Sequence, residues 1–198
     1  MRIIAGSHRG KKLKSPKGLA TRPVLARVRE ALFTILGDMS GLRVLDLFAG
    51  TGAIGLEALS RGADSLVLVE SGFHQCSIIR DNLAALGREG TVIRADVSRA
   101  LKRLVRDGKT FDFIFLDPPY ERGFAQVAVK EIFAERLLSP GGIIAATVRH
   151  TESMPDGEGV YEMIFDRRYG DTRLVIYREK QTESGSPPLT DIKGGLLL

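Results

Sequence analysis

Short apolar runs alternate along this chain with longer stretches in which apolar residues recur at helical spacing. Runs dense in Val, Ile, Leu and Phe are typical of strands buried on both faces, and they cover residues 44–47, 65–70, 91–96, 111–117 and 142–148. Amphipathic stretches that predict helices lie between or after them, at residues 53–61, 73–86, 97–105 and 123–138. Such an alternation predicts a mainly parallel sheet with helices on both faces.

The pattern extends this core at both ends. Before it, apolar residues at helical spacing predict a helix that begins near Pro23, with Thr21 as its N-cap, and stops at Gly37. After it, Val160–Phe165 and Thr172–Tyr177 predict an antiparallel pair that closes the sheet. The expected architecture is an α/β, Rossmann-like sheet of seven strands.

Two segments fall outside this core. Residues 1–20 predict a basic β-hairpin arm, because two short strand-like stretches flank a glycine-containing turn. Residues 180–198 are rich in Ser, Gly and Pro, which predicts a flexible tail. The expected division is therefore an arm at 1–20, one domain at 21–179 and a tail at 180–198.

One strand-to-helix junction carries the strongest chemical signal. It runs Val44-Leu-Asp-Leu-Phe-Ala-Gly-Thr-Gly-Ala-Ile-Gly55, an apolar strand followed by closely spaced glycines. Gly50 and Gly52 can adopt positive φ, and the free amides that open the helix suit an electron-rich ligand. The Gly-x-Gly-x-x-Gly spacing also fits a dinucleotide fingerprint, with Glu70 downstream as the ribose acid. Glycine spacing alone leaves NAD and S-adenosylmethionine open.

Acidic residues stand at the ends of four successive predicted strands: Asp46, Glu70, Asp96 and Asp117. Because the carboxyl ends of parallel strands share one edge of the sheet, we expect these acids along one rim. There Asp46 could meet a cationic amino group, and Glu70 could accept both ribose hydroxyls. Asp96 could accept from an adenine amine or cap the helix that follows it. These four acidic residues favour S-adenosylmethionine over NAD as the ligand.

The fourth strand ends in Asp117-Pro118-Pro119-Tyr120. Two prolines fix the backbone and lack amide donors, so the Asp117 side chain and the Pro118 carbonyl remain available as acceptors. Such acceptors suit an amine substrate, and Tyr120 could stack on an extruded base. The turn therefore predicts a substrate that carries an amino group.

The net charge of +5 hides an asymmetry along the chain. Nine basic residues precede the first acid, Glu30, and the rest of the chain carries 20 basic against 24 acidic residues. A run of one sign at this density predicts a polyanionic partner, here nucleic acid. The candidate RNA-binding residues are Arg2, Arg9, Lys11, Lys12, Lys14, Arg22 and Arg27. Arg29 is expected to extend the same basic surface.

The remaining composition restricts the setting. Cys76 is the only cysteine, so no disulfide can form within the chain. No apolar run is long enough to cross a membrane, and the N-terminus lacks a secretory apolar core. We therefore expect a cytoplasmic protein, active as a monomer and without a metal.

Several motifs together resemble one known family. They are Arg2-Ile-Ile-Ala-Gly6, Thr21-Arg-Pro23, Arg27-Val-Arg-Glu-Ala-Leu-Phe33, Asp46-Leu-Phe-Ala-Gly-Thr-Gly52, Gly55-Leu-Glu-Ala-Leu-Ser-Arg-Gly62 and Phe115-Leu-Asp-Pro-Pro-Tyr120. This chain is similar in them to the bacterial 16S rRNA (guanine(966)-N(2))-methyltransferases, over roughly residues 1–178. The resemblance implies a class I methyltransferase fold, S-adenosyl-L-methionine as cofactor and 16S ribosomal RNA as partner, either free or within a 30S assembly intermediate.

The resemblance also implies roles for particular residues. Those expected to act in catalysis are Asp117, Pro118, Pro119 and Tyr120. Those expected to bind the cofactor are Asp46, Phe48, Ala49, Gly50, Thr51, Gly52, Glu70, Ser71, Asp96 and Val97. The chain departs from the family at Val24, Leu25 and Ala26, where two threonines and an aspartate are usual.

Three other readings stay open on the sequence. An adenine-N6 methyltransferase on DNA or RNA would share every pocket residue named here. A nucleic-acid-binding protein that has kept the fold but lost catalysis would fit the departure at residues 24–26. An NAD oxidoreductase would leave the basic arm and the Asp-Pro-Pro-Tyr turn without a role.

Overall fold

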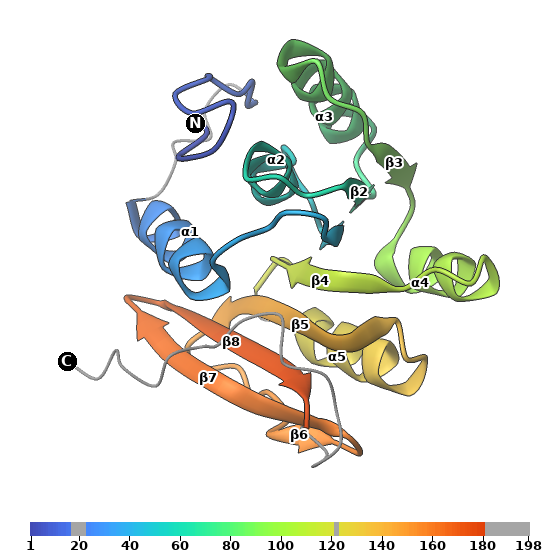
Figure 1. The fold of residues 1–198 in the computed structure, drawn as a ribbon. Helices are drawn as coiled ribbons and strands as arrows, with labels where there is room; N and C mark the ends of the chain where they lie inside the picture. Colours follow the sequence, from blue (N-terminus) through green and yellow to red (C-terminus); the bar gives the residue numbers. More distant parts are fainter. Residues whose placement is uncertain (17–22, 121–122, 181–198) are drawn as a thin grey trace.

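The computed structural model describes residues 1–16, 23–120 and 123–180, and it contains one mixed sheet (Figure 1). The strand order is β3-β2-β1-β4-β5-β8-β7-β6. The strands are β1 (Arg43–Leu47), β2 (Ser65–Glu70), β3 (Thr91–Arg94), β4 (Phe111–Leu116), β5 (Leu138–Arg149), β6 (Gly157–Glu158), β7 (Tyr161–Tyr169) and β8 (Thr172–Glu179). The first five strands are parallel, and β8, β7 and β6 continue the sheet antiparallel. The expected Rossmann-like architecture is confirmed.

The prediction of seven strands was one short. The additional strand, β6, has two residues, and it pairs with the start of β7 through Gly157↔Glu162 and Glu158↔Tyr161. A two-residue strand leaves no hydrophobic alternation in the sequence, so pattern analysis had nothing to detect.

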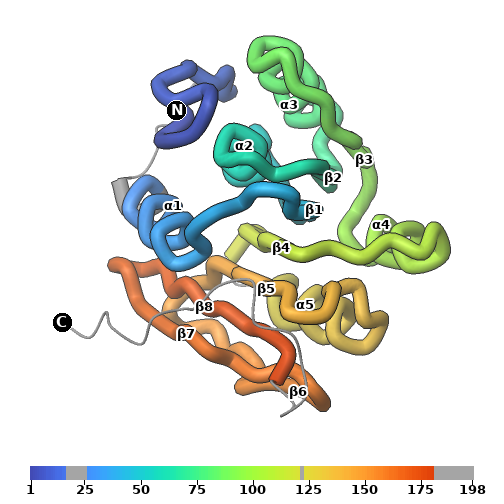
Figure 2. The backbone as a smooth tube through the Cα atoms, viewed as in Figure 1, coloured from blue at the N-terminus to red at the C-terminus, as the bar shows by residue number. Residues whose placement is uncertain are grey.

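Helices cover both faces of the sheet (Figures 1 and 2). They are α1 (Pro23–Leu36), α2 (Ala53–Ser60), α3 (Phe73–Leu86), α4 (Val97–Arg106) and α5 (Phe124–Ala134). Helices α1, α2 and α3 pack on one face through a core that includes Leu32, Leu56 and Ile79. Helices α4 and α5 pack on the other, where Leu101 and Ile132 are buried. None of the described helices is long and apolar enough to span a membrane.

The strand order reverses between β1 and β4, which places a crevice at their carboxyl ends. Leu47 of β1 lies beside Leu116 of β4. Asp117 therefore emerges next to the glycine turn that follows β1. This is the place where ligands bind in open parallel sheets.

Helix α5 is shorter than the predicted 123–138 and β5 begins earlier than the predicted 142. The helix ends at Ala134, and Arg136 follows with a left-handed φ of 50°. Leu138 then pairs with Phe111, with an irregularity before the regular register resumes at Phe113. The apolar residues that extended the helical pattern belong to the first residues of the strand.

The two ends of the arm pair antiparallel, as in the predicted hairpin, but the pairing is too short to form regular strands. Arg2 bridges Lys12, and the amide of Ile3 donates to the carbonyl of Lys11 at 3.0 Å, with turns between them. Its few apolar side chains are buried against the domain, with Ile3 2% and Leu13 3% exposed. A segment with so few apolar residues cannot form its own core, so contacts with the domain determine its shape.

Helix α2 holds the arm through a buried carboxylate. Glu57 is 0% exposed, and it accepts from the amides of Ile4 at 2.7 Å and Ala5 at 2.9 Å. Its remaining partner is Arg61, whose Nε donates at 2.8 Å. Gly6 then passes so close to α2 that a Cβ there would lie 1.8 Å from the carbonyl oxygen of Ser60. The arm is thus fixed by backbone contacts that its sequence does not reveal.

Some predictions fall outside the described residues. They concern the N-cap Thr21, the cation Arg22 and the tail beyond Lys180.

Candidate active site

The turn between β1 and α2 is built from left-handed residues. Phe48 has a φ of 58°, Gly50 of 57° and Gly52 of 77°. Two of these are glycines, as expected, whereas Phe48 is a strained exception of the kind found at functional sites. Gly55 lets α2 approach β2, since a Cβ there would lie 2.7 Å from the Leu66 side chain. The turn is therefore tight, and its backbone is open to a ligand.

A cavity of about 380 Å³ lies beside this turn; we call it the Glu70 cavity. It brings together five of the predicted cofactor residues: Phe48, Glu70, Ser71, Asp96 and Val97. Phe48 and Phe124 stack with ring centroids 6.2 Å apart and provide an apolar wall. The cavity therefore combines an apolar surface with two carboxylates.

Hydrogen bonds orient the Glu70 carboxylate. One oxygen accepts from the amide of Gly50 at 2.9 Å, and the other accepts from the amide of Gly72 at 2.8 Å. Oε1 also accepts a longer hydrogen bond from Oγ of Ser71 at 3.4 Å, so Oε2 keeps a lone pair for a ligand hydroxyl and Oε1 can accept a second one only in place of Ser71. The carboxylate thus also connects the end of β2 to the glycine turn.

Asp96 fulfils the capping role that was one of its two predicted functions. Its Oδ1 accepts from the amide of Arg99 at 2.9 Å at the start of α4. Because Asp96 also lines the Glu70 cavity, capping and ligand binding are compatible.

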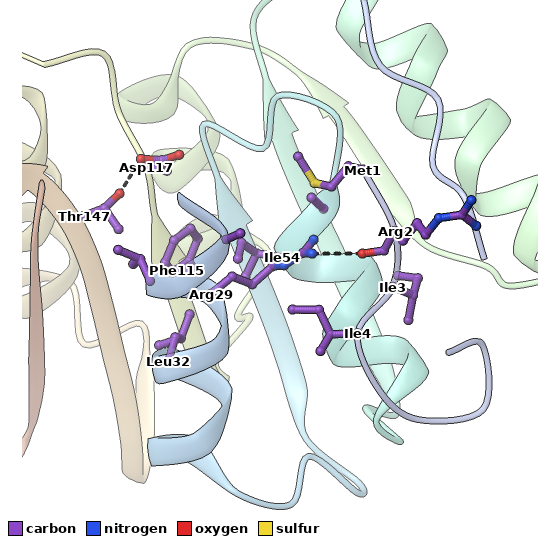
Figure 3. Close-up of a pocket in the computed structure, with 13 residues that line it drawn as sticks. Met1, Arg2, Ile3, Ile4, Arg29, Leu32, Ile54, Phe115, Asp117 and Thr147 are labelled. Carbon is purple, nitrogen blue, oxygen red and sulfur yellow. Dashed lines mark hydrogen bonds between the residues drawn. The ribbon is translucent and has the colours of Figure 1, made fainter. Parts of the chain in front are cut away.

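A second cavity, of about 440 Å³, lies between the arm, α1 and the end of β4; we call it the Asp117 cavity (Figure 3). Its walls are mainly apolar and include Ile3, Ile4, Leu32, Ile54 and Phe115. Polar groups reach it from three elements: Asp117 after β4, Thr147 on β5 and Arg29 on α1. Such a cavity suits a ligand with an apolar body and a few polar atoms.

Asp117 is held by Thr147, whose Oγ1 donates a hydrogen bond to Oδ1 of Asp117. Burial raises the pKa of the Asp117 carboxyl, and the hydrogen bond from Thr147 opposes that rise. Pro119 lines the Glu70 cavity, so this turn contributes one residue to each of the two cavities. The Tyr120 hydroxyl is 3.1 Å from Oγ1 of Thr172 on β8, which orients the tyrosine.

Asp46 lies one residue inside β1 and is 2% exposed, rather than standing free at the strand end. It accepts from the amide of Gly55 at 3.0 Å, which ties the strand to α2. Burial raises its pKa to about 7, and the negative charges of Asp117 and Glu70 add to the rise. The acids do share one rim, but Glu70 and Asp117 line different cavities and Asp46 is in neither lining.

Asp46 should make the free protein less stable as the pH rises. Its folded pKa of about 7 exceeds the ordinary value of 3.8, so the folded state keeps this proton to higher pH than the unfolded chain. The free energy of unfolding should fall by roughly 2–3 kcal/mol between pH 5 and pH 8 through this group. Denaturant titrations at both pH values should show the fall, and Asp46→Asn should reduce it by that amount. An unchanged fall in the variant would contradict this.

The predicted RNA-binding cations lie mostly on the surface. Arg2, Arg9, Lys11 and Lys12 of the arm are exposed, as is Arg27 on α1. Lys14 is exposed as well, but its Nζ pairs with Asp81 of α3 at 3.1 Å. Arg22 lies outside the described residues.

Arg29 does not extend the basic surface as expected; it is 8% exposed and lines the Asp117 cavity. Arg29 lies three residues after Ala26 and three residues before Leu32. At this helical spacing it is on the same side of α1 as these two lining residues. The spacing alone does not show that Arg29 is buried, because the arm that packs against α1 is what covers it. Thr147 was missed because a threonine inside an apolar strand has no distinguishing pattern.

The sequence is similar to known proteins over most of its length. A family model described as Conserved hypothetical protein 95 matches residues 1–178. The Bacillus subtilis (strain 168) protein YlbH is 35% identical over 183 residues, covering 91% of this chain and 100% of YlbH. Ribosomal RNA small subunit methyltransferase D of Escherichia coli (strain K12) is 33% identical over 186 residues, covering 93% of each chain.

Two solved structures are also similar to this chain over most of its length. The structure of yhhF from Escherichia coli superposes with a TM-score of 0.79 at 29% identity, covering 92% of this chain and 99% of that one. The 16S rRNA N2 G1207 methyltransferase RsmC of Thermus thermophilus, solved with AdoMet and guanosine, has a TM-score of 0.62 at 25% identity. That match covers 83% of this chain and 45% of RsmC.

Proposed function

The chain belongs to the Conserved hypothetical protein 95 family, and we propose that it methylates the exocyclic N2 amine of a guanine in 16S ribosomal RNA. It is an S-adenosylmethionine-dependent methyltransferase that acts on ribosomal RNA, as its relatives are named to do. The observation that carries the finer proposal is the Asp117 carboxylate, which Thr147 orients in an apolar cavity two residues before Pro119 lines the Glu70 cavity.

The Glu70 cavity fits the adenosine half of S-adenosylmethionine. Two backbone amides orient Glu70, which could accept one ribose hydroxyl on Oε2 and a second on Oε1 in place of Ser71, and Phe48 and Phe124 provide an apolar wall for a purine. The Glu70 carboxylate in the lining of this cavity would favour a ligand that carries a positive charge, such as a sulfonium. When bound, S-adenosylmethionine supplies the electrophilic methyl group.

Asp117 and the Pro118 carbonyl would prepare the amine. The lone pair of guanine N2 is delocalised into the ring, which makes the amine a weak nucleophile. Accepting both N–H hydrogens would draw the nitrogen towards tetrahedral geometry and direct the lone pair at the methyl group. The sulfur–methyl bond would break as the nitrogen–methyl bond forms, S-adenosylhomocysteine would leave, and the nitrogen would lose one proton to Asp117 or to water. This is positioning and electrostatic work, and alignment of the reactants can supply up to about 7–11 kcal/mol.

Adenine-N6 methylation is the nearest rival, because an adenine amine could use the same acceptors. The guanosine that RsmC binds in its solved structure favours guanine. A protein without catalysis would have no use for the oriented Asp117 carboxylate. An NAD oxidoreductase would leave both that carboxylate and the basic arm unexplained. We infer a monomeric, cytoplasmic enzyme whose substrate is 16S RNA, free or in a 30S assembly intermediate.

Mapping of methylated bases tests the proposal. In cells lacking this protein, one guanine of 16S RNA should lose its N2-methyl group, and the purified protein should restore it. The enzyme should transfer methyl groups to RNA whose target is guanine and not to the matched RNA with adenine there. Loss of an N6-methyladenine instead would establish the rival activity.

The arm should make RNA binding strongly dependent on salt. Each phosphate contact on a single strand contributes about 0.7 to the slope of log affinity against log salt concentration. The double variant Lys11→Gln/Lys12→Gln should therefore lower that slope by about 1.4. RNA binding measured across a salt series checks this, with Lys130→Gln on α5 as an exposed control. If the double variant keeps the full slope, these lysines do not contact phosphates.

A further inference from the structure

Arg29 is a buried guanidinium whose hydrogen-bonding capacity is mostly unused. Its Nη2 donates to the carbonyl oxygen of Arg2 at 2.9 Å. Neither Nε nor Nη1 has a hydrogen-bond partner among the residues that the structure describes. Because buried polar groups are nearly always hydrogen-bonded, unpaired donors on a side chain that lines a cavity indicate a ligand with acceptor atoms.

The Asp117 cavity has acceptors and donors in separate places. Asp117 and Thr147 lie together at the ends of β4 and β5, whereas the Arg29 side chain reaches from α1 towards Arg2 of the arm (Figure 3). Apolar side chains, among them Phe115 and Ile54, form the wall around them. A ring with a donor edge, an acceptor edge and apolar faces would satisfy all of these groups.

Guanine has this distribution of polar atoms. Its N2 amine donates, while O6 and N7 on its other edge accept, and arginine is the residue that most often binds O6 and N7. We propose that Arg29 binds the O6/N7 edge of the target guanine while the N2 amine lies at Asp117, so that Arg29 determines the choice of guanine over adenine. This inference rests on the proposed function and assigns its base specificity to one side chain.

Adenine is rejected by the same contact. In the pose of guanine it would present its N6 amine where O6 is expected, and two donors would face each other. A site built to bind a polar group discriminates strongly against an analogue that lacks it, because the buried partner is left unpaired. Asp117 alone accepts from either amine and cannot make this distinction.

The alternative occupant is the carboxylate at the amino-acid end of the cofactor. An anion would also suit a buried guanidinium, and burial lowers the pKa of Arg29 while nearby Glu57 opposes the effect. Arg29 and Asp117 could pair with the carboxylate and the ammonium of such a chain, but a flat ring would cover more of the mainly apolar wall, which favours a base. The experiment below separates the two.

The test uses RNA in which the mapped target guanine is replaced by 2-aminopurine, which lacks O6, or by 7-deazaguanine, which lacks N7. Both keep the N2 amine. The unaltered enzyme should lose roughly tenfold to a hundredfold in kcat/KM on 2-aminopurine and about tenfold on 7-deazaguanine. Arg29→Met should lose a similar factor on guanine itself and then show no further loss on either analogue. Arg29→Lys, which keeps the charge without the planar fork, should discriminate less than arginine.

Calorimetry with S-adenosylmethionine provides the control for folding and for the alternative occupant. Arg29→Met should bind the cofactor as the unaltered enzyme does, and Arg106→Met, an exposed cation on α4, should change neither binding nor discrimination. Weakened cofactor binding with unchanged discrimination would assign Arg29 to the carboxylate and overturn the inference. Equal rates of the unaltered enzyme on guanine and both analogues would also overturn it, even if the variants fail to fold. Failure of the proposed function is a different result, namely no transfer to guanine at all.

Discussion

Replacing Asp117 with alanine should lower methyl transfer by roughly a hundredfold to a thousandfold, the loss seen when one preorganised polar contact to the reacting group is removed. Binding of S-adenosylmethionine should stay nearly unchanged, because Asp117 lines the apolar cavity rather than the Glu70 cavity. Single-turnover transfer to 16S RNA and calorimetry with the cofactor measure the two effects separately.

The matched variant is Asp117→Asn, which keeps one acceptor oxygen and the contact with Thr147. We expect it to retain more activity than alanine, since an amide oxygen can still accept from the amine. If alanine and asparagine lose the same factor, the negative charge of Asp117 matters more than its acceptor. If cofactor affinity falls as far as methyl transfer does, Asp117 is a cofactor residue and the proposed mechanism is wrong.

Replacing Glu57 with alanine should lower the free energy of unfolding by roughly 3 kcal/mol, at the lower end of the cost of breaking a buried ion pair. The substitution leaves Arg61 and the amides of Ile4 and Ala5 without their acceptor. We expect the lower end because the Arg61 side chain is 20% exposed and can recover water. Urea titration of the variant measures the loss.

Two further measurements show whether this loss comes from the arm. Hydrogen exchange at the amides of Ile4 and Ala5 should accelerate in Glu57→Ala, because the carboxylate that protects them is gone. Glu57→Gln, which keeps an acceptor of similar size, should lose less stability, and Glu89→Ala at an exposed site should lose almost none. If the two amides stay protected in Glu57→Ala, the arm is held by other contacts.

Regular apolar periodicity was sufficient to predict most of the sheet and its helices. Helix α3 has its predicted bounds of Phe73–Leu86, and α4 and β2 match to within one residue. Each of these elements has one buried side or is buried on both sides, and burial produces a regular pattern of apolar residues in the sequence. The glycine turn and the Asp-Pro-Pro-Tyr turn were also placed correctly, because their residue types are tied to backbone conformation.

Features that depend on tertiary contacts produce no regular pattern in the sequence. Arg29 resembles the other basic residues near it, and only the packing of α1 against the arm shows that it is buried. Asp46 looked like a free acid at a strand end, yet the approach of Gly55 buries it. The rim of acids was predictable from strand ends, but its division between two cavities depends on where the arm and α1 cover the sheet.

The way the arm docks has a consequence for the newly made chain. Residues 2–14 leave the ribosome before their partners Glu57, Ser60 and Asn82, which follow 50 or more positions later. The basic arm therefore has none of these docking partners while the next quarter of the protein is synthesised. During that interval the arm can bind nearby RNA. The Asp117 cavity is also incomplete, because Ile3 and Ile4 of the arm form part of its wall.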